Sequence, residues 1–129
     1  ERKPPAQCLH AIETLPPNAP PGTPRGVDHA YAIRDWRPDG ELRRAAVLRD
    51  PRSGRTLEIL TDQPSIQVYM ANFLDRSLTG KEGAVYGPNA AICLETQKFP
   101  DSIHHPDWPS VRLDPGQTYR HTMVHRFGR

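Results

Sequence analysis

The stretch SIQVYMAN, residues 65–72, carries the pattern that determines the fold class. Its apolar side chains alternate with polar or aromatic ones, Ile66, Val68 and Met70 against Gln67 and Tyr69. Successive side chains on a β-strand point to opposite faces, so alternation with a period of two residues predicts a strand. One face of this strand should pack on a core, and the other should present an amide and a phenol.

Five more segments have the composition of strands and are bounded by turn residues. They are HAYAIR (29–34), LRRAAVLRD (42–50), RTLEILTD (55–62), AAICLETQ (90–97) and TYRHTMVHRF (118–127). The turn signals between them include Pro38-Asp39-Gly40, DPRSG (50–54) and Asp114-Pro115-Gly116, which indicate hairpins. No segment sustains the 3.6-residue period of a helix. We therefore predict an all-β fold of antiparallel sheets, arranged as a sandwich or a barrel.

The composition of the 129-residue chain fits one domain with an extended part. Hydrophobic residues make up 36% of the chain, and seven of its 15 prolines fall in residues 1–25. We predict an extended Pro-rich connector over residues 1–25, with a Pro-rich ligand for a partner domain as the alternative. The net charge of +2 speaks against binding to nucleic acid or to an anionic membrane. No apolar run approaches the roughly 18 residues of a transmembrane helix.

The two cysteines, Cys8 and Cys93, provide neither a disulfide framework nor a pair with metal-ligand spacing. Reduced thiols in a cytosolic protein are the simplest interpretation. The chain begins with Glu1 instead of Met and shows no signal peptide, so we expect it to start inside a longer reading frame or after processing. These features together predict a cytoplasmic protein.

Motifs for a metal or for a nucleophile are weak in this sequence. His121 and His125 lie four residues apart, but on a predicted strand that spacing is about 13 Å, too far for one ion. Cys93 lies in the middle of a predicted strand, where a packed thiol is favoured over a nucleophile. The sequence contains neither a G-x-S-x-G turn nor a phosphate-binding glycine loop. We therefore expect no metal and no cofactor.

Glu95 is the unusual residue of the segment CLETQKFPD, residues 93–101, because it lies inside an apolar strand. On that strand it points to the face opposite Ile92 and Leu94. Taken alone, Glu95 is most simply a solvated glutamate. A sheet that presents Glu95 together with Gln67 would suit a sugar, because hydroxyl groups bind to carboxylates and amides while one flat apolar surface packs on the ring.

Three segments, in this order, resemble the aldose 1-epimerases, the galactose mutarotase family. They are GVDHAY (26–31), SIQVYMANFLD (65–75) and CLETQKFPDSIHHPDWP (93–109). The resemblance extends from about Gly26 to the C-terminus and includes GAVY (83–86). It implies that residues 26–129 are the C-terminal portion of a large galactose-mutarotase-like β-sandwich.

The resemblance also implies an activity and a site. Members of the family interconvert the α and β anomers of free hexoses such as galactose and glucose, and the reaction needs neither a metal nor a cofactor. The glutamate of C-L-E-T-Q is the general base of the family, so Glu95 inherits that role. Asp28 and Gln67 stand at positions that bind sugar hydroxyls. Val27 and Ala30 depart from the residues usual beside Asp28 and could alter the choice of sugar.

One part of the family site lies outside the resemblance. The catalytic acid of the family is a histidine on the N-terminal side, and no histidine of this chain matches its motif. We therefore expect two partners for this chain: a monosaccharide substrate, and the missing N-terminal portion of the same enzyme. The alternative is a catalytically incomplete sugar-binding or structural remnant of the family.

Overall fold

The structure is a computed structural model that describes residues 22–23 and 26–129. In this part of the chain it has eight strands and two short 3-10 helices. The strands are β1 (Asp28–Ala32), β2 (Arg43–Arg49), β3 (Thr56–Thr61), β4 (Ser65–Tyr69), β5 (Leu78–Thr79), β6 (Val85–Tyr86), β7 (Cys93–Gln97) and β8 (Met123–Gly128). The helices are η1 (Lys81–Gly83) and η2 (Ser102–His104). The connector expected over residues 1–25 lies outside the described residues, apart from Gly22 and Thr23.

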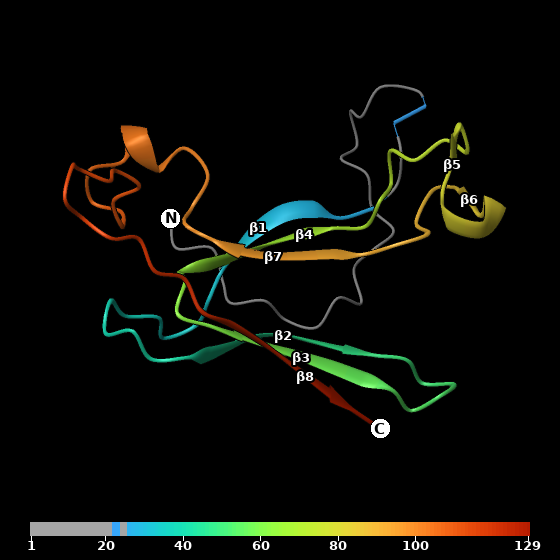
Figure 1. Ribbon diagram of the computed structural model, residues 1–129, viewed down its shortest axis with the longest axis horizontal. Coiled ribbons are helices and arrows are strands. Elements are labelled where there is room, and N and C mark those ends of the chain that lie inside the picture. Colours follow the sequence, from blue (N-terminus) through green and yellow to red (C-terminus); the bar gives the residue numbers. More distant parts are fainter. Residues whose placement is uncertain (1–21, 24–25) are drawn as a thin grey trace.

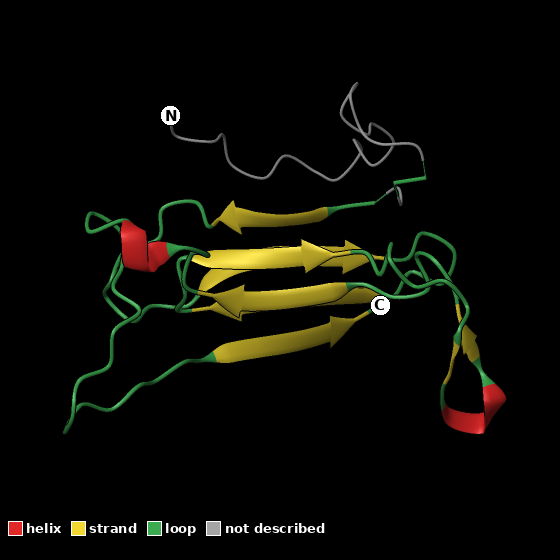
Figure 2. Cartoon of the chain, turned by 90° about the horizontal axis from the view of Figure 1, so that it is seen from above, coloured by secondary structure: helices red, strands yellow, loops and turns green. Residues whose placement is uncertain are grey.

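The longer strands form two three-stranded antiparallel sheets, one with the order β1-β4-β7 and one with the order β2-β3-β8. The two sheets lie one above the other (Figure 1), and their strands run along a similar axis (Figure 2). β5 and β6 pair as a separate small hairpin. The all-β antiparallel class expected from the sequence is confirmed. Within the described residues, no helix has the length and apolar character needed to cross a membrane.

Strand neighbours in these sheets come mostly from distant parts of the chain. The expected hairpin is present between β2 and β3, which pair antiparallel. The turn signal at Pro38-Asp39-Gly40 does not close a hairpin, because it lies between β1 of one sheet and β2 of the other. β1 pairs with β4 instead, and β4 pairs on its other side with β7. Turn signals in the sequence thus mark where strands end, but not which strands pair.

The turn between β2 and β3 is closed by the Asp50 carboxylate. Its oxygens accept hydrogen bonds from the Ser53 hydroxyl at 2.6 Å and from the Arg52 backbone N–H at 3.0 Å. These bonds lower the pKa of Asp50 below its usual value, and the Ser53 hydroxyl has the largest effect. Gly54 ends the turn with φ of +74°, a left-handed conformation that glycine adopts without strain. Local chemistry therefore explains this one hairpin, where the sequence prediction succeeded.

The core lies between the two sheets. Ile66 and Val68 of β4 are 2% and 4% exposed, and Ile59 of β3 is 1% exposed. Thr96 of β7 reaches the other sheet, where its Oγ1 lies 3.3 Å from Sδ of Met123. The face of β4 that the alternation assigned to the core is therefore the inner face of its sheet, and the opposite face is the outer one.

β8 begins at Met123, later than the sequence predicted, because the Asp62–Thr122 pair keeps only one of its two backbone hydrogen bonds, from the Asp62 N–H to the Thr122 carbonyl at 3.3 Å. The Thr122 N–H donates to the Asp62 carboxylate at 3.0 Å. The Asp62 carbonyl, which would accept the next ladder hydrogen bond, accepts the Trp36 indole N–H at 2.7 Å. The strand expected over residues 118–127 is therefore wrong for residues 118–122 and correct from Met123 onward.

Packing between the sheets can be tested with Ile59→Ala. Truncation of this buried side chain leaves a cavity and should lower the free energy of unfolding by about 2–5 kcal/mol. Val47→Ala is the matched control, because Val47 is 55% exposed and lies on the opposite face of the same sheet. Its effect should stay within about 0.5 kcal/mol. Urea unfolding followed by tryptophan fluorescence measures both changes, and equal effects would contradict a core at Ile59.

Candidate functional site

The candidate site lies on the outer face of the β1-β4-β7 sheet, which we call the site face. Antiparallel pairing places Gln67 of β4 opposite Glu95 of β7 and opposite Ala30 of β1. Asp28 precedes Ala30 by two residues, so it points to the same face. Side chains directly opposite one another have Cβ atoms about 4.5–5.5 Å apart, and diagonal ones about 7–8 Å. The register therefore brings together Asp28, Gln67 and Glu95, the three site residues expected from the sequence.

Asp28 and Gln67 are joined by a direct hydrogen bond. Gln67 Nε2 donates to Asp28 Oδ1 at 2.6 Å. This bond orients the Gln67 amide and leaves its oxygen as an acceptor. Glu95 is exposed, and it forms no hydrogen bond or ion pair with any other residue that the structure describes. An Asp–Gln pair beside an unpaired carboxylate offers polar atoms to several hydroxyl groups at once.

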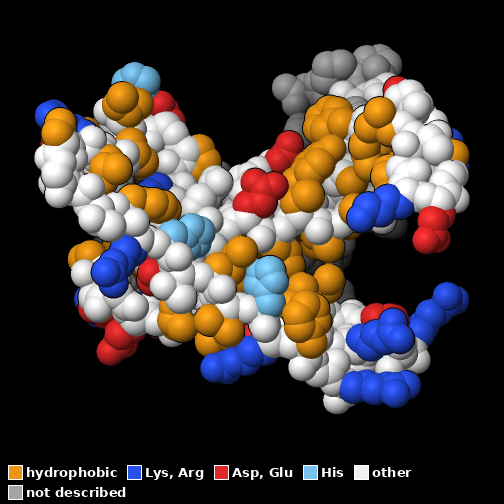
Figure 3. All heavy atoms as spheres, in the orientation of Figure 1, with side chains coloured by type: hydrophobic (Ala, Val, Ile, Leu, Met, Phe, Trp, Pro, Cys, Tyr) orange, Lys and Arg blue, Asp and Glu red, His pale blue; other side chains and the backbone are white. Residues whose placement is uncertain are grey.

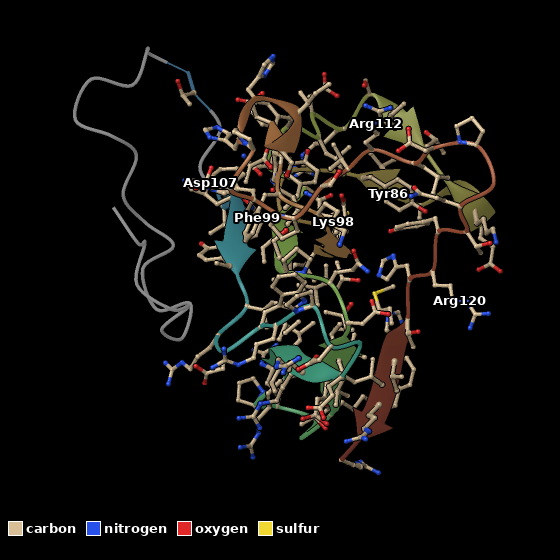
Figure 4. All side chains as sticks on the ribbon, turned by 90° about the vertical axis from the view of Figure 1, so that its left-hand side faces the viewer. Tyr86, Lys98, Phe99, Asp107, Arg112 and Arg120 are labelled. Carbon is tan, nitrogen blue, oxygen red and sulfur yellow. The ribbon has the colours of Figure 1, made fainter. Side chains whose placement is uncertain are left out.

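The site face lies in a hollow of the molecular surface. Figure 3 shows acidic side chains on the floor of this hollow, between the lobe of the loop after β7 and the lobe of the β5–β6 hairpin. Lys98 and Phe99 follow directly after β7 (Figure 4), and the Phe99 ring lies 5.2 Å from the Trp108 ring. Trp108 also stacks on His105 at 3.9 Å. Packed aromatic side chains thus hold the loop that forms one wall.

Three of the five described histidines belong to the inner faces or to the other sheet. His29 follows Asp28 directly and therefore points to the inner face. His121 contacts the inner face of β7, where its Nε2 lies 2.8 Å from Thr96 Oγ1. His125 lies on β8, in the β2-β3-β8 sheet. None of these three histidines lies beside the carboxylates of the site face.

The other two described histidines, His104 and His105, share the carboxylate of Asp101. His104 Nδ1 is hydrogen-bonded to Oδ1, and His105 Nε2 lies 3.6 Å from Oδ2. Asp101 has a left-handed backbone with φ of +63°, which turns the chain shortly after β7. In the described part of the chain, no group of three or more His, Cys, Asp or Glu side chains is arranged to hold a metal ion. The two imidazoles are therefore engaged within their own loop.

The structure adds an aromatic residue that the sequence did not place at the site. Phe73 follows β4 after a turn at Ala71, whose backbone φ is +50°. Its ring stacks on Tyr69, which lies on the site face opposite the free, half-buried Cys93. The period-two alternation ends at Met70, so no periodic signal reaches Phe73. The signals that could have indicated the pair are the spacing of two aromatic residues across a turn and the place of both residues in the segment SIQVYMANFLD (65–75).

Comparison with known proteins points to one family. The family model described as Aldose 1-epimerase matches residues 7–126. The galactose mutarotase of Mus musculus is 43% identical over 102 residues, which cover 79% of this chain and 29% of that protein. The galactose mutarotase of Homo sapiens is 42% identical with the same coverage of both chains. The aldose 1-epimerase of Escherichia coli (strain K12) is 30% identical over 105 residues, 80% of this chain and 30% of that protein.

The matched residues 7–126 include the three segments in which the sequence resembles this family. The matches and the strands together indicate an all-β protein related to enzymes that act on aldoses. The chain belongs to the aldose 1-epimerase family. It spans about 29% of the length of the mutarotase relatives that it matches.

Proposed function

We propose that this chain carries the base side of an aldose 1-epimerase site, which interconverts the α and β anomers of free hexoses such as galactose and glucose. The observation that carries the proposal is the meeting of Asp28, Gln67 and Glu95 on one face of the β1-β4-β7 sheet. Family membership supports this class of reaction, and in the proposal the three side chains supply the groups needed on one side of the sugar.

In the proposed reaction, Glu95 takes the proton from the hydroxyl group on C1 while an acid protonates the ring oxygen. The bond between C1 and the ring oxygen breaks, and C1 becomes the aldehyde of the open-chain sugar. After rotation about the C1–C2 bond, the ring oxygen attacks the other face of C1. Each proton then returns to its starting side, so the reaction consumes nothing and needs no cofactor. Asp28 and Gln67 hold the hydroxyl groups that do not react.

The acid is proposed to come from a portion of the fold that the matched segment does not include. Residues 26–129 would be the C-terminal part of a large β-sandwich domain, and the N-terminal portion of the same enzyme would be their partner, in the cytoplasm. Exposed apolar side chains on the inner face of β8 support a surface of that kind. Phe127 is 79% exposed and Met123 is 41% exposed, although both share a face with the buried Ile59.

A second candidate function is sugar binding, or a structural role, without catalysis. It is favoured by the placement of the described histidines, because His29, His121 and His125 belong to other faces. His104 and His105 are held by Asp101. A chain with a base and no acid should retain part of the affinity for a sugar and lose most of the rate, since each positioned acid or base contributes roughly 10²–10⁴-fold.

Polarimetry of α-galactose separates the two candidates. The isolated chain should anomerise galactose no faster than buffer. A chimera in which the matched segment replaces the corresponding 102 residues of the Mus musculus galactose mutarotase should be fast. Glu95→Gln in that chimera should lower the rate by at least about a hundredfold, while Glu58→Gln on the other sheet should not. A chimera that binds galactose but turns over at the buffer rate would support the remnant, and a near-normal rate for Glu95→Gln would exclude Glu95 as the base.

Asp28→Ala and Gln67→Ala should weaken binding rather than abolish chemistry. Each variant loses hydrogen bonds to hydroxyl groups, worth roughly 0.5–3 kcal/mol depending on charge. Titration of the chain with galactose, followed by NMR, measures the dissociation constants. Glu41→Ala is the control, because its side chain is 77% exposed and lies outside the site face. Unchanged affinity in both Asp28→Ala and Gln67→Ala would remove these residues from the site.

A further inference from the structure

Tyr69 and Phe73 form a stacked aromatic pair at the edge of the site face. Their ring centroids lie 6.3 Å apart, with an interplanar angle of 21°. Tyr69 is opposite Asp28 on β1 and opposite Cys93 on β7, in the row next to that of Gln67 and Glu95. Phe73 is 61% exposed. The exposed ring therefore leaves an apolar surface open at the edge of the sheet that carries Asp28 and Glu95.

The backbone after β4 is shaped to hold this pair. Ala71 is 3% exposed and has φ of +50°, a conformation that a residue with a Cβ adopts only at a cost. Its carbonyl accepts hydrogen bonds from the N–H groups of Leu74 and Asn89, both at 3.2 Å. The Phe73 N–H donates to the Tyr69 hydroxyl at 3.3 Å. The turn therefore places the Phe73 ring over Tyr69 by specific contacts.

The start of β1 supports the same turn from the other side. Asn72, which precedes Phe73, is 4% exposed and lies against Gly26. A Cβ at Gly26 would come within 2.7 Å of the Asn72 Cβ, so only glycine fits there. Gly26 has φ of +152°, which also favours glycine. Close packing of Gly26 on Asn72 thus fixes the segment before Asp28 against the segment that carries Phe73.

We propose that Phe73, backed by Tyr69, is the apolar wall of the sugar site and favours hexoses with the galactose configuration. This inference rests on the proposed function. A hexose ring has polar edges and C–H faces, and an aromatic face packs against the C–H groups while side-chain oxygens bind the hydroxyls. In galactose the axial 4-hydroxyl leaves the hydrogens of C3, C4 and C5 together on one face. In glucose the hydrogen of C4 points to the opposite face.

Packing at C3 to C5 also suits a reaction at C1. The hydrogens on C3, C4 and C5 keep their configuration in both anomers and during ring opening. A wall that contacts these atoms would hold the sugar through the reaction and leave C1 free to rotate toward Glu95. Phe73 is thus assigned as a binding and specificity residue, not as a catalytic one.

Saturation-transfer NMR with the 129-residue chain tests this assignment, with galactose and glucose as probes. Irradiation of the aromatic protons should saturate H3, H4 and H5 of galactose most strongly. Phe73→Ala should raise the dissociation constant for galactose about tenfold, the scale of one aromatic contact, and should affect glucose less. Phe73→Tyr keeps the ring and should retain the affinity. Phe127→Ala removes another exposed ring, from the other sheet, and should change nothing.

The outcomes distinguish a failure of the Phe73 assignment from a failure of the proposed sugar site. If Phe73→Ala leaves the galactose affinity unchanged while Asp28→Ala weakens it, the wall is wrong and the site stands. Equal losses for galactose and glucose would overturn the proposed selectivity. If the wild-type chain shows no saturation transfer to either sugar, the proposed sugar site is wrong, and so is the assignment of Phe73 to it. Thermal unfolding of each variant shows whether an altered affinity comes from an altered fold.

Discussion

Strand β4 is paired on both sides, and its register determines both faces of the β1-β4-β7 sheet. On the inner face, Ile66 and Val68 are buried between the sheets. On the outer face, Gln67 lies opposite Glu95 and within hydrogen-bonding distance of Asp28. A slip of one residue against either neighbour would bury the Gln67 amide and expose Ile66, at the cost of both burial and hydrogen bonding. The packing of the core therefore selects the register that assembles the site.

Side-chain hydrogen bonds of Thr61 tie the end of β3 to the segment that precedes β8. The Gln63 N–H donates to Thr61 Oγ1 at 3.1 Å, and Thr61 Oγ1 donates to the Thr122 carbonyl at 3.0 Å. Thr61 is fully buried, so these bonds satisfy polar groups that water does not reach. Toward the other end of β8, Phe127 is mostly exposed. The β2-β3-β8 sheet is thus held by side-chain hydrogen bonds at the start of β8 and leaves Phe127 uncovered near the end of that strand.

Much of this arrangement could be predicted from the sequence. The features that could not be predicted have identifiable physical reasons. Alternation and turn residues predicted the six longer strands but not β5 and β6, and alternation placed Glu95 on the face opposite the core, as the structure confirms. The pairing of strands could not be predicted, because hydrogen-bonded neighbours such as Asp28 and Gln67 lie 39 residues apart. Residues 118–122 have a strand-like composition, but contacts of Asp62 end the ladder before them.

The meeting of β1, β4 and β7 also has a consequence during biosynthesis. β1 leaves the ribosome well before its partner, since Asp28 and Gln67 are separated by 39 residues. At roughly 5–20 residues per second, β1 waits for a few seconds with its backbone edge unpaired. Nonlocal pairing of this kind is slow, and an open edge is a target for chaperones or for another nascent chain. Because Glu95 lies on β7, the polar face of this sheet is complete only after translation has passed Gln97.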